Sequence, residues 1–176
     1  MEFSQGGRAR SSLLMLGVAL CLFLSLNCEA AIHAVDGTVS ARYFNEARSA
    51  WDKTTISVFY DDQHQVTLMG GHGREKASVR MNHDEFDLLR DALKDGRTRL
   101  SRNLDRQDIL ELFRVIRGSG PYTHGMTVSY WSGNADLAGA IVLFLQDDDN
   151  LLSRMELYLD DEEIKALLSQ LSRVPH

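Results

Sequence analysis

The first thirty residues constrain the fold more than any other part of the chain, because they hold both of its cysteines. Arg8 and Arg10 stand in a polar opening, an apolar run covers Leu13 to Leu26, and small alanines follow. This order is typical of a secretory signal peptide. The run is shorter than the roughly 20 residues that a membrane-spanning helix needs. We therefore predict a signal peptide over residues 1–30 and an extracytoplasmic protein, periplasmic or secreted.

Two other fates of this segment stay open. An uncleaved signal would leave the domain anchored to a membrane, and acylation of Cys28 would tether it by a lipid. Cleavage after Ala30 would instead remove Cys21 and Cys28 together. The mature domain would then have neither a disulfide nor a cysteine metal ligand, and its stability would depend on its hydrophobic core alone.

Composition and charge narrow the class of protein. Hydrophobic residues make up 44% of the chain and charged residues 25%, which is ordinary for a folded globular domain. The formal net charge is −6. Binding to phosphate groups needs a basic face, so we expect no nucleic-acid partner.

The first half of the chain predicts strands followed by a capped helix. Residues 31–53 form an N-terminal extension in which apolar residues recur at helical spacing, so we expect a helix there. Strands are expected over 54–60, 64–69 and 76–81, where β-branched and aromatic residues alternate between turns. Asn82 and Glu85 then form a capping box, and the helix that they begin should end at Gly96.

The second half predicts a helix, three strands and a final helix. The residues Ile109, Leu112, Phe113 and Ile116 fall at i, i+3, i+4 and i+7, which predicts a helix over 105–117. Strands are expected over 126–131, 139–145 and 154–159. Asp160 should cap the C-terminal helix.

This order of elements predicts one α+β domain over residues 54–176, with an antiparallel sheet and helices packed on one face. The strand-to-helix junctions at 78–94 and 156–172 resemble each other, with three of five compared positions identical. A duplicated βββα unit is one explanation of this similarity. The other explanation is that any strand followed by a capped helix shows a similar pattern.

The sequence contains no clear pattern of catalytic or metal-binding residues. The histidines His64, His72 and His83 lie in different segments, and their spacing assembles no zinc site, so we expect no metal site, no cofactor and no catalytic constellation. His124 ends a glycine-rich loop, Gly118 to Gly125, whose backbone could approach a ligand closely. The acidic run Asp147 to Asp149 could gather oxygen ligands for calcium, although it does not fit the EF-hand pattern.

Three functions follow as hypotheses. The first is a non-enzymatic binding module whose partner is a protein or an envelope component, recognised through an open sheet face or strand edge. The second is a small enzyme with a site around Gly118 to Gly125, in which His124 acts as acid or base beside an acidic residue. The third is a module stabilised by calcium. A concave cleft holding His124 beside an Asp or Glu would favour the enzyme, and a flat apolar patch around Trp131 would favour the binding module.

Overall fold

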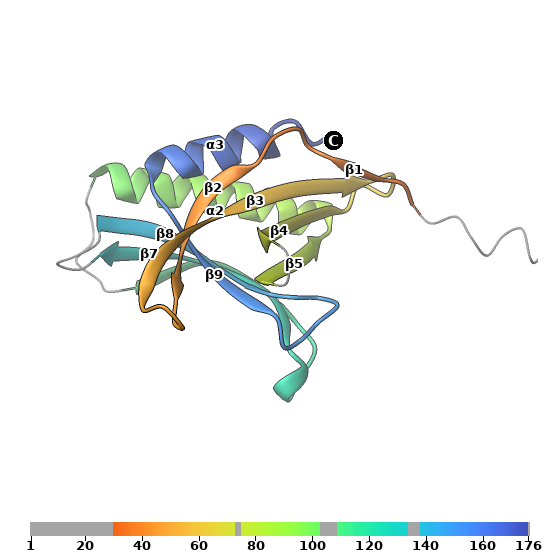
Figure 1. Cartoon of the computed structure of the whole chain (residues 1–176). Coiled ribbons are helices and arrows are strands. Elements are labelled where there is room, and N and C mark those ends of the chain that lie inside the picture. Colours follow the sequence, from red (N-terminus) through yellow and green to blue (C-terminus); the bar gives the residue numbers. More distant parts are fainter. Residues whose placement is uncertain (1–29, 73–74, 103–108, 134–137, 176) are drawn as a thin grey trace, which may run out of the picture. The chain divides into compact units, whose positions relative to one another are not determined.

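The computed structural model describes residues 30–72, 75–102, 109–133 and 138–175, and Ile32–His176 forms one compact unit (Figure 1). The expected signal peptide lies outside the described residues, apart from Ala30. No helix in the described part of the chain combines the length and the apolar character needed to cross a membrane.

Each half of the domain consists of strands followed by a helix. The first half comprises β1 (Ile32–Ala34), β2 (Val39–Asn45), β3 (Ala50–Asp61), β4 (Val66–His72), β5 (Glu75–Met81) and α2 (His83–Arg102). The second half comprises β6 (Ile109–Arg117), the short 3-10 turn η1 (Gly120–Tyr122), β7 (His124–Gly133), β8 (Ala138–Gln146), β9 (Arg154–Leu159) and α3 (Asp161–Leu171). Both helices follow directly on the last strand of their half.

The strands form one antiparallel sheet in the order β5-β4-β3-β2-β9-β8-β7-β6, with β1 paired to β3. Although four strands separate β5 from β8 in this order, the turn after β8 is hydrogen-bonded to β5: Asp148 N donates to Ser78 O at 3.0 Å. Gly70 of β4 also lies so close to the other half of the sheet that a Cβ there would meet Leu157 Cδ1 at 2.4 Å. These contacts require the sheet to curl, because a flat sheet would hold them far apart.

The expected fold class, an antiparallel sheet with helices packed on one face, is therefore wrong. The protein is mostly strand and forms a curled half-barrel with two helices. Helix α2 contacts β5 at one end of the sheet and β6 to β8 at the other, and α3 contacts β2, β3 and β9. The hydrophobic core lies inside this curl, between strands of both halves and the apolar sides of the helices. The recurring order is also longer than the expected βββα unit, because β2 and β6 precede the three strands.

The expected helix in the N-terminal extension is wrong as well. Residues 39–45 form β2, which pairs along its whole length with β3, and β3 begins at Ala50 rather than at Thr54. The apolar residues Val39 and Ala41 alternate with exposed or half-buried residues, as in a strand with one face in the core. This segment is part of the sheet and not an extension of it.

The expected helix over 105–117 is in fact strand β6, which pairs with β7. A β-bulge between Glu111 and Phe113 shifts the alternation by one residue. Leu112 and Phe113 are therefore both directed away from solvent although they are adjacent in the sequence. The helical spacing came from Ile109 and Ile116, which are exposed on the other face of the strand, whereas Leu110 and Val115 pack against the core beside Leu112 and Phe113. Helix α2 in turn runs past Gly96, which is buried against Ile141, to Arg102.

The two predicted helix caps, Asn82 and Asp160, are confirmed. Asn82 Oδ1 accepts from Glu85 N at 2.9 Å, and Glu85 Oε2 accepts from Asn82 N at 3.0 Å. Asp160 and Glu163 form the same reciprocal pair at the start of α3. These short-range interactions fix where each helix begins on the sheet.

Candidate functional site

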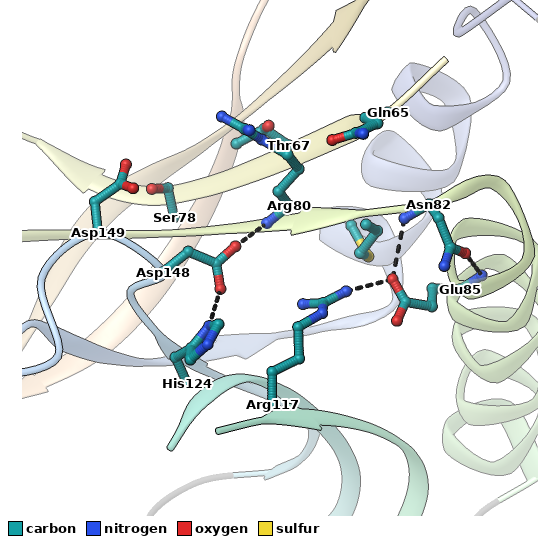
Figure 2. Close-up of a pocket in the computed structure, with 11 residues that line it drawn as sticks. Gln65, Thr67, Ser78, Arg80, Asn82, Glu85, Arg117, His124, Asp148 and Asp149 are labelled. Carbon is teal, nitrogen blue, oxygen red and sulfur yellow. Dashed lines mark hydrogen bonds and ion pairs between the residues drawn. The ribbon is translucent and has the colours of Figure 1, made fainter. Parts of the chain in front are cut away.

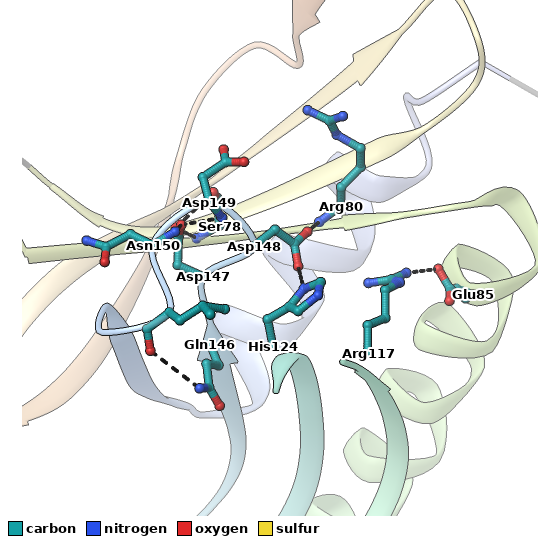
Figure 3. A network of polar contacts seen from close by, with 11 residues as sticks. Ser78, Arg80, Glu85, Arg117, His124, Gln146, Asp147, Asp148, Asp149 and Asn150 are labelled. Carbon is teal, nitrogen blue, oxygen red and sulfur yellow. Dashed lines mark hydrogen bonds and ion pairs between the residues drawn. The ribbon is translucent and has the colours of Figure 1, made fainter. Parts of the chain in front are cut away.

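A network of carboxylates closes the curled sheet at the turn between β8 and β9 (Figure 3). Asp147 is buried, and its Oδ2 accepts from the backbone N (2.7 Å) and the hydroxyl (3.0 Å) of Ser78 on β5. Its Oδ1 accepts from the backbone amides of Asp149 (2.9 Å) and Asn150 (2.7 Å) within the turn. Burial alone would raise the pKa of Asp147, but these hydrogen bonds outweigh burial and lower it. Asp147 therefore joins the two halves of the sheet as a charged acceptor.

Asp148 extends this network to His124 at the start of β7. Its Oδ2 accepts from Arg80 N at 2.6 Å, and its Oδ1 lies 2.6 Å from His124 Nδ1. His124 and Asp148 are mostly buried, with side chains 25% and 20% exposed. The imidazole is thus held by one nitrogen, and Nε2 is the nitrogen left to contact a ligand.

The polar pocket is a cavity of about 370 Å³ lined by His124, Asp148, Arg117 and residues of β4, β5 and α2 (Figure 2). Arg117 forms an ion pair with Glu85, the residue that also caps α2. Ser78, which lines the same pocket, donates its hydroxyl to Asp147 rather than to His124. The charged groups of the polar pocket are thus largely paired with one another. Among the described residues that line it, an oriented histidine lies beside an arginine, but no nucleophile is hydrogen-bonded to that histidine.

The calcium hypothesis gains no support from this turn. The oxygens of Asp147 are occupied by four protein donors, and Asp148 is engaged by Arg80 and His124. In the part of the chain that the structure describes, no group of three or more His, Cys, Asp or Glu side chains could hold a metal ion. Asp147 and Asp148 hold the turn against β5 instead.

A row of aromatic side chains crosses the outer face of the sheet, opposite the core. Phe44 and Trp51 are direct cross-strand partners on β2 and β3, with ring centroids 5.6 Å apart. Tyr158 of β9 follows at 4.8 Å from Trp51, and Trp131 of β7 at 5.6 Å from Tyr158. All three contacts are edge-to-face, the arrangement that aromatic quadrupoles favour. Four strands thus contribute to one aromatic row.

This row lies in the aromatic groove, a hollow of about 990 Å³ whose remaining walls come from the β2–β3 turn, the ends of β5 and β8, and the segment 152–156. Phe44 is 46% exposed, Trp51 40% and Leu152 94%, so apolar surface faces solvent here. The Tyr158 hydroxyl donates to Glu156 at 2.6 Å, and burial, followed by this bond, raises the pKa of Tyr158. Contiguous exposed apolar surface of this kind commonly marks an interaction site.

Sequence reasoning had singled out some of these residues and missed others. His124 does meet an acidic partner, Asp148, in a cleft. Trp131 lies in a hollow and not on the flat apolar patch that we expected, and its ring contacts Tyr158. Phe44 and Trp51 were missed, because their segment was interpreted as helical and the strand pairing that brings them together could not be seen. Their separation by seven residues across a short turn is the signal that would have predicted a β-hairpin.

Comparisons with known proteins add little. No protein-family model matches the sequence, and no curated protein does. One solved structure, from a study reporting that mutations in SsgB correlate to longitudinal cell division during sporulation of Streptomyces coelicolor, is similar with a TM-score of 0.38 and 13% identity. The match covers 83% of this chain and 90% of that chain. A likeness of this degree carries no inference about function.

Proposed function

We propose that the protein is an exported binding module that holds a protein partner in the aromatic groove. The observation that carries the proposal is the aromatic row of Phe44, Trp51, Tyr158 and Trp131, two of whose members, Phe44 and Trp51, are exposed to solvent. Tryptophan and tyrosine are the residues most enriched in the energetically dominant parts of protein interfaces. Export is supported by the sequence of residues 1–30, and binding by the exposed apolar surface.

The proposal is tested by selecting peptides from a random display library on the mature protein. Trp51→Ala should weaken the selected peptides by about 30-fold or more, since a central tryptophan of an interface is worth about 2 kcal/mol or more. Affinity is measured by isothermal titration calorimetry, and circular dichroism checks that the variant is folded.

Leu88→Ala is the matched control, because Leu88 is an apolar residue 59% exposed on α2, away from the aromatic groove. It should leave the affinity unchanged. The proposal fails if no peptide is enriched, or if the enriched peptides bind Trp51→Ala and the wild type equally well.

A second candidate function is acid–base catalysis on a small molecule in the polar pocket. The contact between His124 Nδ1 and Asp148 Oδ1 favours it, since a carboxylate that orients an imidazole is a common feature of such sites. With p-nitrophenyl acetate as the probe, His124→Gln should lower any hydrolysis above background by at least about 100-fold. Equal rates for the wild type and His124→Gln would remove this candidate.

A further inference from the structure

We infer that the partner enters the aromatic groove as an extended peptide and adds a strand between β2 and β9. The inference rests on the proposed function, because it specifies how a protein partner would bind at the same place.

The sheet is open between β2 and β9. The two strands are neighbours, yet in the described chain they are paired only at Arg42 and Tyr158, whereas β2 pairs with β3 at seven positions. Beyond Arg42 the hairpin of β2 and β3 diverges from β9 (Figure 1). The facing edges of Tyr43–Asn45 and Arg154–Leu157 therefore have no strand beside them within the described residues.

An unpaired strand edge presents a row of backbone N–H and C=O groups that another chain can pair with. Such edges bind extended peptides in several classes of recognition domain, where the main chain provides affinity and alternate side chains provide specificity. Here the two open edges border the aromatic groove, since Tyr43, Phe44, Asn45 and residues 154–156 line it. Backbone pairing and apolar contact are available to the same ligand.

The geometry of a strand then defines the ligand. Successive side chains of an added strand point to opposite faces. One set would extend the row formed by Trp51, Tyr158 and Trp131 on the outer face, and the other would face Tyr43 and Met155, which also line the groove. We therefore expect a peptide with apolar or aromatic residues at alternate positions.

The charge of the groove favours a peptide with little net charge. The walls of the groove carry acidic and basic side chains in similar numbers, so neither sign of charge dominates. The acidic residues are Glu46, Glu75 and Glu156, and the basic residues are Lys76 and Arg154. Binding should depend weakly on salt, in contrast to the steep dependence of nucleic-acid binding. A glycan would also stack on the aromatic rings, but it has no regular series of backbone amides to pair with the strand edges.

The decisive test methylates the backbone nitrogens of a selected peptide. Two versions are made, each N-methylated at alternate residues, one in each phase of the strand. Methylation leaves every side chain in place but removes the donors that pair with the sheet. Affinity is followed through tryptophan fluorescence, because the chain has two tryptophans and both, Trp51 and Trp131, line the aromatic groove. At least one version should bind about tenfold or more weakly, as expected from losing two or more hydrogen bonds.

The outcomes separate this inference from the function on which it rests. If the peptides depend on Trp51 but both methylated versions bind within about threefold of the parent, strand addition is wrong and the protein-binding function stands. If no selected peptide depends on Trp51, the proposed function fails and strand addition fails with it. Quenching by an N-acetylglucosamine oligomer, with no peptide bound, would also overturn both.

Discussion

Gly71→Ala is expected to lower the free energy of unfolding by about 3 to 5 kcal/mol. Gly71 has a φ of +94°, a region that costs an L-residue about 1 to 3 kcal/mol. A Cβ at this position would also lie 2.1 Å from Glu75 O and 2.6 Å from Met155 Cε. The first contact is with backbone of β5 and cannot be relieved by a side-chain rotation, so overpacking adds about 1 to 3 kcal/mol. Urea unfolding followed by circular dichroism measures the loss.

Gly120→Ala separates these two causes. Gly120 also has a positive φ, +58°, but no atom lies within 4 Å of the position that its Cβ would occupy. Its replacement should cost only the backbone strain, about 1 to 2 kcal/mol. If both variants lose the same stability, the close approach of the β5 backbone at Glu75 contributes nothing at Gly71 beyond the backbone strain.

The parts of this fold that the sequence predicted are those set by neighbouring residues. The start of each helix can be predicted from four consecutive residues, because a capping box needs no contact with a distant part of the chain. The two capping boxes pair Asn82 with Glu85 and Asp160 with Glu163. Strands β4, β5 and β7 to β9 were recognised for a similar reason, since alternation is a local pattern. Strand β6 was not recognised, because apolar residues lie on both of its faces and a bulge at Leu112 interrupts the alternation.

The curl of the sheet depends on contacts that no local pattern contains. Ser78 and Asp147 are 69 residues apart, and only the folded chain brings the backbone of β5 to the turn after β8. The same holds for the aromatic row, whose members Phe44, Trp51, Tyr158 and Trp131 come from four strands of both halves. His124 could be selected as a candidate from its glycine-rich loop, but Asp148 became its partner only through this curl.

Asp147→Asn is expected to destabilise the protein by about 2 to 4 kcal/mol at pH 7, because it replaces a buried acceptor of four hydrogen bonds with an amide whose NH₂ faces donors. Asp149→Asn is its matched control: it removes the same charge from an exposed neighbour and should change stability by less than about 0.5 kcal/mol.

The contribution of Asp147 to the free energy of unfolding should also depend on pH and should decrease at low pH. The hydrogen bonds hold its folded-state pKa below the unfolded-state value of about 3.9, so the unfolded chain binds the proton more tightly. Its stabilising contribution is therefore complete above about pH 4 and is lost as the pH falls through the folded-state pKa. Urea unfolding at a series of pH values should show a shallower decline below about pH 4 for Asp147→Asn than for the wild type or Asp149→Asn. Parallel declines in all three proteins would mean that the Asp147 carboxylate does not hold the turn to β5.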